Sequence, residues 1–304
     1  MESPLQNDDM TVKASALTIF LCILFGANTV AIKLCLTGIG AFTAAGIRFA
    51  IAATVIFLWA RYKKTSLKLK KKQLGQMLVL SVIFVVQLSF FYLGLGKTTA
   101  SHGVLISNVL PFIVLIMAHF FIPGDSISLK KGVGITLGFL GVLFLFFDNQ
   151  DLTGEFIKGD LIILAAVFLW SSNAVYVKRI ISEYTAVQIT IYPMIIGTPF
   201  FFLAGFLWDD QMIHMINPTI IKSLLYQSIV TASFGFIAWN TLLQKFGATA
   251  LHSFVFIMPI AGVFCGVLIL GEAITPNLAA SIAFIVAGVI IVNLRRKKRP
   301  ASVH

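Results

Sequence analysis

The chain has 304 residues, of which 58% are hydrophobic and only 12% are charged, and its mean hydropathy is +0.95. Soluble globular domains carry about 25% charged residues, so this composition excludes an ordinary soluble protein and predicts a membrane protein. The net charge of +11 does not indicate nucleic-acid binding, because the basic residues cluster beside the ends of apolar runs and form no separate basic segment with a fold of its own.

Ten apolar runs are long enough, or nearly so, to cross a hydrocarbon core about 30 Å thick. They cover residues 14–36, 41–60, 74–96, 98–121, 132–147, 160–181, 186–208, 222–244, 248–270 and 277–294. The sequence therefore predicts an all-α membrane protein with ten transmembrane helices. An acidic linker over 148–159 separates the first five helices from the second five, and residues 295–304 form a basic tail.

The first run contains a pattern that returns in the sixth. Residues 25–33 read Phe-Gly-Ala-Asn-Thr-Val-Ala-Ile-Lys, and residues 170–178 read Trp-Ser-Ser-Asn-Ala-Val-Tyr-Val-Lys. Two copies of a unit with an odd number of spans lie inverted relative to each other in the membrane, an arrangement typical of secondary transporters. The sequence thus predicts two inverted five-helix repeats, over 14–147 and 160–294.

The pattern places a lysine at the end of both copies, Lys33 and Lys178. Long lysine side chains at helix ends reach the lipid headgroups. We expect headgroup anchoring for both residues in preference to substrate contact.

The second run carries Arg48 near the middle of the membrane. An arginine at the centre of a spanning helix costs about 2.5 to 3.5 kcal/mol, so it needs a partner, and no acidic residue falls well inside a predicted span. Two interpretations remain open. Backbone carbonyls and helix ends hold Arg48 for structural reasons, or Arg48 faces a wet cavity and attracts an anionic group such as a substrate carboxylate.

Amides and aromatic side chains lie at similar depth in several runs, and buried amides need partners from another helix or from a ligand. The candidate pathway residues, with Arg48, are Asn28, Gln87, Phe91, Tyr92, Asn108, Trp170, Asn173, Tyr176, Trp239 and Asn240. An interhelical hydrogen bond is the simpler expectation for any single amide, whereas several of these residues together are expected to line a pathway.

Pro111 and Pro259 lie near the midpoints of the fourth and ninth runs, where each removes a backbone donor and bends the helix. His102 and His252 lie at nearly symmetry-related depths in the same two runs. They are either satisfied interfacial histidines or a pair of gate or proton sites. Glycines at four-residue spacing, as in Gly134–Gly138 and Gly262–Gly266, predict close helix packing.

Most of the 23 Lys and Arg residues fall on one side of the predicted spans, and Arg61 to Lys72 is the longest basic stretch. The positive-inside rule then predicts that both termini of this multi-pass protein are cytoplasmic, and we expect the protein in the cell's inner membrane. The lipid bilayer and a small-molecule substrate are the expected partners, and the sequence leaves open a monomer or a homodimer.

No cofactor, metal or ATP site is expected. Gly96-Lys97-Thr98 resembles the end of a phosphate-binding loop, but Phe91 stands where that motif requires its first glycine. The three cysteines show no spacing of a disulfide framework or a metal site. Without clustered carboxylates or an activated nucleophile, a membrane-embedded lipid enzyme is the least favoured function, and a passive facilitator or channel is the main alternative to a carrier.

Taken together in order, these motifs resemble the drug/metabolite transporter superfamily in its EamA-type branch of ten helices. The resemblance rests on residues 25–33, on Arg48-Phe49-Ala50, on Thr99-Ala100-Ser101 followed by Pro111, and on Leu270-Gly271-Glu272. It implies that helices one, three, four, six, eight and nine line a central path, that helices five and ten are peripheral, and that the protein exports amino acids or related metabolites by alternating access. The sequence departs from the family pattern at Ile122-Pro123 and at Asp125.

Overall fold

The computed structural model describes residues 10–121, 129–147, 154–246, 251 and 254–293. In this part of the chain the regular structure is helical, apart from an isolated β-bridge between Ile39 and Ile213. The helices are α1 (Val12–Leu36), α2 (Ala41–Tyr62), α3 (Lys71–Lys97), α4 (Ala100–Ser107), α5 (Leu110–Phe121), α6 (Leu129–Phe146), α7 (Glu155–Ile180), η1 (Ile181–Glu183), α8 (Ala186–Trp208), α9 (Pro218–Leu225), η2 (Tyr226–Gly235), α10 (Phe236–Phe246), α12 (Ile257–Leu270) and α13 (Pro276–Asn293).

Nine helical stretches among the described residues are long and apolar enough to cross a membrane, and α12 is a shorter apolar helix of 14 residues. The predicted all-α membrane fold is confirmed. Several boundaries agree closely with the apolar runs, and α8 covers the predicted 186–208.

The fourth predicted span is divided into α4 and α5. α4 ends at Ser107 and α5 begins at Leu110, immediately before Pro111. Pro111 has no N–H to donate to the carbonyl of Ser107, and its ring clashes with that carbonyl in a regular helix. The proline therefore explains why the helix is interrupted here.

The eighth predicted span runs through α9, η2 and α10, and η2 is a ten-residue π-helix. Long π-helical stretches are rare and often occur at functional sites. This one places Gln227 and Thr231 toward the centre of the bundle, where both are fully buried.

The first helix of the second half begins earlier than predicted. α7 begins at Glu155 rather than at 160, after Gly154 in a left-handed conformation. Its first turns are polar, and the side chains of Glu155 and Lys158 are 43% and 65% exposed, so the apolar pattern detects only the later part of the helix. As a result Asp160 is the sixth residue of the helix and not its first.

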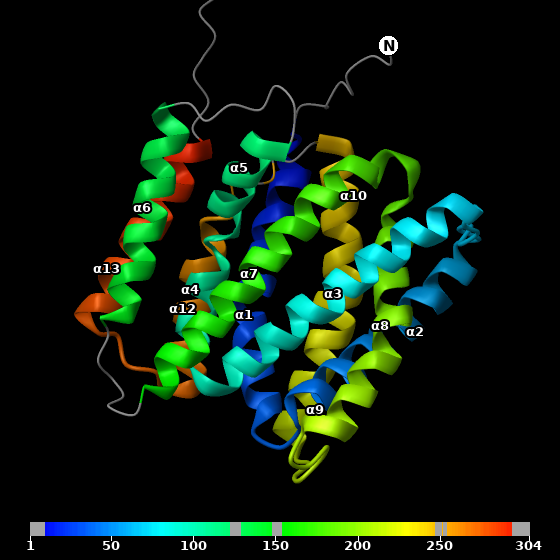
Figure 1. Ribbon diagram of the computed structural model, residues 1–304, viewed down its shortest axis with the longest axis horizontal. Coiled ribbons are helices and arrows are strands. Elements are labelled where there is room, and N and C mark those ends of the chain that lie inside the picture. The colour runs from blue at the N-terminus through cyan, green and yellow to red at the C-terminus, as the bar shows by residue number, and fades with distance from the viewer. Residues whose placement is uncertain (1–9, 122–128, 148–153, 247–250, 252–253, 294–304) are drawn as a thin grey trace, which may run out of the picture.

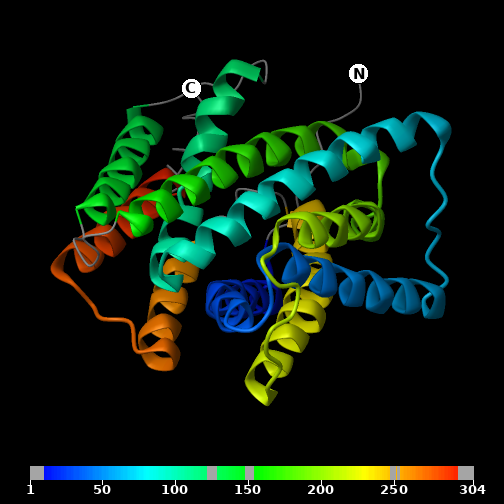
Figure 2. The same ribbon diagram turned by 60° about the horizontal axis from the view of Figure 1, so that its bottom comes forward.

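Figure 1 shows α1 at the centre of the bundle, and Figure 2 views it nearly end-on. α3 and α7 run side by side in both views, and α6 packs against α13 at one edge of the molecule. The peripheral place of α6 and α13 agrees with what the resemblance implies for helices five and ten.

Glycines allow the closest helix contacts. A Cβ atom on Gly134 of α6 would lie 2.8 Å from the carbonyl oxygen of Gly288 on α13, and one on Gly262 of α12 would lie 2.9 Å from that of Gly26 on α1. Close packing of this kind holds membrane helices together, because the hydrophobic effect does not drive association between helices that are already surrounded by lipid. The close packing predicted at these glycines is confirmed.

Two ends of the bundle matter for the site. We call the end where α1, α3 and α8 finish and α2, α4 and α9 begin the α9 end; it lies at the bottom of Figure 1. The other is the opposite end, where α2 finishes and α3 begins.

Candidate functional site: a buried arginine and a polar closure at one end

Arg48 lies on α2, about 10 Å from the start of that helix at 1.5 Å per residue. Its side chain is almost fully buried, with 3% of its surface exposed. Nη1 donates to the hydroxyl of Tyr92 at 3.1 Å, and Nη2 donates to Oγ1 of Thr231 at 3.4 Å. The guanidinium carbon lies 5.0 Å from the ring centre of Phe49.

The neighbours of Arg48 are themselves hydrogen-bonded. Tyr92 donates to Oε1 of Gln227 at 2.9 Å, and the hydroxyl of Thr231 lies 2.9 Å from Oδ1 of Asn28. We call Asn28, Arg48, Tyr92, Gln227 and Thr231 the central network; they come from α1, α2, α3 and η2. The expected backbone carbonyls are not the partners of Arg48: side-chain hydroxyls hold it, because α3 and η2 bring Tyr92 and Thr231 against α2.

A second group of predicted residues lies between α3 and α7. Asn173 donates to Oε1 of Gln87 at 3.3 Å, while its own Oδ1 is buried without a hydrogen-bond partner. The rings of Phe91 and Trp170 meet edge to face with centroids 6.4 Å apart. These four residues thus join the first half of the chain to the second.

The remaining predicted residues are spread over the bundle. Tyr176 donates to the carbonyl of Gln76 at 3.5 Å, Asn240 donates to Thr190 at 3.0 Å, and Asn108 donates to the carbonyl of Val104 at 2.7 Å at the α4–α5 break. Trp239 packs edge to face on Phe25. Pro259 is buried in the first turn of α12. His252 lies outside the described residues, as do Ile122 to Asp125.

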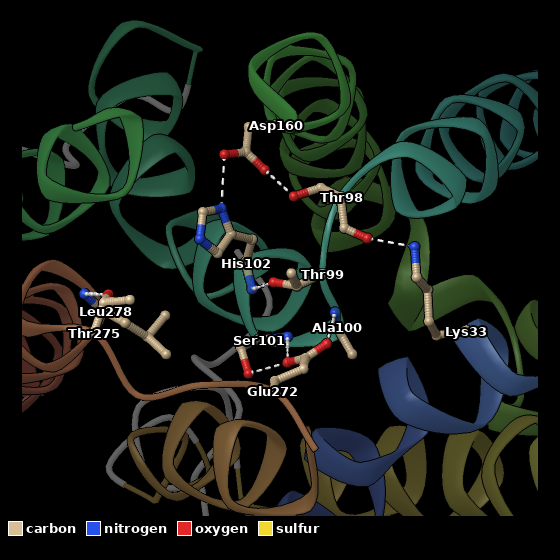
Figure 3. Close-up of polar contacts among 10 residues, drawn as sticks. All are labelled: Lys33, Thr98, Thr99, Ala100, Ser101, His102, Asp160, Glu272, Thr275 and Leu278. Atoms are coloured by element: carbon tan, nitrogen blue, oxygen red, sulfur yellow. Dashed lines mark hydrogen bonds and ion pairs between the residues drawn. The ribbon is translucent and has the colours of Figure 1, made fainter. Parts of the chain in front are cut away.

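The first turn of α4 is held by a carboxylate from the other half of the chain. Glu272, in the turn after α12, accepts from the backbone N–H groups of Ala100 at 2.6 Å and Ser101 at 2.9 Å, and from the Ser101 hydroxyl (Figure 3). Free N–H groups at a helix N-terminus favour a negative charge. Glu272 is therefore a cap supplied from a distant part of the chain.

Asp160 holds the same region from α7. Its Oδ2 lies 2.8 Å from Nδ1 of His102, and its Oδ1 accepts from the Thr98 hydroxyl at 2.7 Å (Figure 3). Asp160 is 1% exposed. Because α7 starts earlier than its apolar pattern does, Asp160 lies in the second turn of the helix, near the α9 end and not well inside the span.

Lys33 of α1 provides a third contact. Its ammonium donates to the carbonyls of Leu95 at 2.8 Å and Gly96 at 3.3 Å, and also to that of Thr98. These are the unsatisfied carbonyls at the end of α3. The expected anchoring of Lys33 in lipid headgroups is therefore wrong; the side chain of Lys178 is not described.

Thr98, Ser101, His102, Lys33, Asp160 and Glu272 together form what we call the α9-end closure. The start of α2 has a comparable cap at the same end. Asp209, which follows α8, accepts from the backbone of Phe42 at 3.2 Å and Thr43 at 2.9 Å, and from the Thr43 hydroxyl at 2.7 Å. Both caps connect one half of the chain to the other.

A cavity of about 360 Å³ lies elsewhere, between α5, α6 and α7, and its lining is apolar. It is lined by Ile113, Ile116, Met117, Phe120, Phe139, Leu164 and Phe168. None of the predicted pathway residues contributes to it. Within the described ranges, no three His, Cys, Asp or Glu residues lie close enough to hold a metal ion.

Comparisons with known proteins agree with this architecture. The sequence profile of the EamA-like transporter family matches residues 12–147 and again residues 157–294. The chain belongs to the EamA-like transporter family and is a multi-pass membrane transporter.

Relatives and a solved structure match nearly the whole chain. A "probable amino-acid metabolite efflux pump" of Escherichia coli strain K12 is 27% identical, and the match covers 88% of this chain and 90% of the relative. The Bacillus subtilis transporter YvbV is 25% identical, and the match covers 95% of this chain and 94% of that relative. A crystal structure of another protein matches with a TM-score of 0.70 at 16% identity, over 92% of this chain and 96% of that one. This likeness supports the fold alone.

Proposed function

We propose that the protein is a secondary transporter of the inner membrane that exports a small organic metabolite, an amino acid or a related compound, by alternating access. Relatives in Escherichia coli and Salmonella typhimurium carry the name of amino-acid metabolite efflux pumps, at 27% and 25% identity. The basic side of the bundle then faces the cytoplasm with both termini. The α9 end faces outward.

One observation carries this proposal: the two halves of the chain are joined by polar side chains at both ends of the bundle, on either side of the central network. At the α9 end Asp160 and Glu272 of the second half hold α4 of the first. At the opposite end Gln73 of α3 donates to the carbonyl of Glu183 at 2.9 Å. There Tyr184 also donates to Gln76, again from the second half to the first. Hydrogen bonds of this kind are individually weak enough to be exchanged, as a carrier that opens one end at a time requires.

The first experiment measures thermal stabilisation of the detergent-purified protein by a panel of amino acids, amines, nucleobases and organic acids. Compounds that stabilise it are then tested for flux in proteoliposomes. We expect selective stabilisation by amino-acid-like compounds and a flux that saturates with concentration. A flux that rises linearly with concentration, without any stabilising compound, would contradict the carrier and favour a passive channel.

A further inference from the structure

Arg48 has no counter-charge among the residues that the structure describes. The ion pairs among the described residues join Lys97 and Lys158 to Glu155, and His102 to Asp160. Arg48 is buried and shares none of them. A guanidinium in a protein remains charged, so a full positive charge lies within the bundle, and its described partners Tyr92, Thr231 and Phe49 are neutral.

The hydrogen bonds of Arg48 are also incomplete. A guanidinium has five N–H donors, and the side chain makes two hydrogen bonds, both to hydroxyl oxygens. Its Nε is buried and has no partner. One face of the group lies over the Phe49 ring, which supplies no acceptor in the plane of the N–H groups.

The surrounding network cannot neutralise Arg48. The Tyr92 hydroxyl gives its only hydrogen to Gln227, and the Thr231 hydroxyl gives its hydrogen to Asn28 or to the carbonyl of Gln227 at 2.8 Å. Both oxygens therefore present lone pairs to Arg48 while their protons point away. The network orients the guanidinium but leaves its charge uncompensated.

The backbone at this place is unusual as well. Gln227 and Thr231 both belong to the π-helix η2. A π-helix widens the turn and is found mostly at functional sites. This observation is independent of the charge on Arg48 and points to the same position.

We propose that Arg48 and the central network form the binding site for the carboxylate group of the transported metabolite. The juxtaposition of an uncompensated guanidinium, an unpartnered Nε and the π-helix η2 selects an anionic, planar group, since a carboxylate accepts two parallel hydrogen bonds from a guanidinium. The inference rests on the proposed function, because it names the chemical group by which a transported compound is recognised.

The test compares matched compounds on the wild-type protein. L-phenylalanine, L-leucine and L-threonine are each paired with the corresponding amino-acid amide, which keeps the side chain and the amine but lacks the carboxylate. Dissociation constants are measured by thermal stabilisation and by isothermal titration calorimetry. For at least one pair we expect the carboxylate to bind at least about tenfold more tightly than the amide, which corresponds to about 1.4 kcal/mol.

Variants connect that preference to Arg48. Arg48→Gln is expected to abolish the preference for the carboxylate over the amide, and Arg48→Lys is expected to keep part of it. Tyr92→Phe leaves the positive charge in place, so it should lower the affinity for acid and amide alike without removing the preference. If Arg48→Gln fails to fold, Arg48→Lys and the acid–amide pairs on the wild-type protein still test whether Arg48 recognises the carboxylate.

Three outcomes would overturn the site. Amides that bind as tightly as their acids would leave metabolite transport in place but remove the carboxylate site. Sodium chloride or sodium phosphate that stabilises the protein as well as the amino acids do would assign Arg48 to simple anions. A protein that none of the compounds stabilises would lose both this site and the proposed function.

Discussion

The carboxylate of Asp160 lies 2.8 Å from Nδ1 of His102, and this contact joins α7 of the second half of the chain to α4 of the first. Asp160 is buried and has two side-chain partners, His102 and Thr98. Hydrogen bonds to charged groups contribute about 1.5 to 3 kcal/mol, so these contacts stabilise the packing of α7 against the start of α4. The α9-end closure therefore depends on Asp160.

Asp160→Ala is expected to loosen the α9 end and increase access to Cys35, a fully buried thiol on α1. In a Cys22→Ser, Cys265→Ser background we expect a several-fold faster reaction of Cys35 with a membrane-impermeant maleimide added from outside. Glu155→Ala is the matched control: it removes a carboxylate of the same helix whose side chain is 43% exposed and which pairs with Lys97 and Lys158, and surface pairs contribute little. Equal labelling rates in the two variants would show that Asp160 does not hold the closure.

Glu272→Ala is expected to destabilise the protein by about 1 to 2 kcal/mol, the usual effect of losing a helix cap. Two backbone N–H groups of α4 lose their acceptor in this variant. Glu272→Gln keeps an acceptor oxygen and loses only the charge, so its melting temperature should lie between those of the Ala variant and the wild type. Thermal unfolding in detergent checks this order, and a melting temperature of Glu272→Ala equal to that of the wild type would refute the cap.

Asp209→Ala tests the corresponding cap on α2. We expect a loss of about 1 to 2 kcal/mol, since Asp209 accepts from two backbone N–H groups and the Thr43 hydroxyl. The neighbouring Asp210 is exposed, and Asp210→Ala should change the free energy of unfolding by less than about 0.5 kcal/mol. Comparable losses from both variants would mean that general charge, and not the cap, is responsible.

Gly134→Ala is expected to reduce the yield of folded protein, because the added Cβ would lie 2.4 Å from Cγ2 of Val292 and 2.8 Å from the carbonyl oxygen of Gly288. Such overpacking costs about 1 to 3 kcal/mol. Gly132 lies on the same helix, and a Cβ there would meet nothing within 4 Å. Gly132→Ala should therefore be neutral or slightly stabilising in a thermal melt, and a similar loss at both positions would contradict the close α6–α13 contact.

The sequence predicts the helical fold well because length and hydropathy determine which segments can cross a membrane. The duplicated pattern at Asn28 and Asn173 predicts the two-repeat arrangement, which the family match supports. The start of α7 escapes detection, since Glu155 and Lys158 make its first turns polar. For the same reason the sequence pattern does not reveal that Asp160 is buried.

The candidate site is predictable only in part. Arg48, Tyr92 and Asn28 stand out as polar or charged residues at membrane depth, whereas Gln227 and Thr231 do not stand out in a span that contains several other polar residues. Gln227 and Thr231 are four residues apart, a spacing that places two side chains on the same face of a helix. This spacing is the signal in the sequence that points to them. The π-helix and the partners of Lys33 and Glu272 depend on contacts between distant segments, which a local pattern does not encode.

The most direct test of transport by alternating access is a counterflow assay in proteoliposomes, with a tritiated amino acid chosen from the compounds that stabilise the protein. A carrier exchanges its substrate across the membrane, so an excess of unlabelled compound inside should accelerate entry of the labelled one and produce a transient accumulation. We predict this accumulation for the wild-type protein, with a saturable initial rate. Entry that is linear in concentration and unaffected by the unlabelled compound would contradict the account and identify a channel.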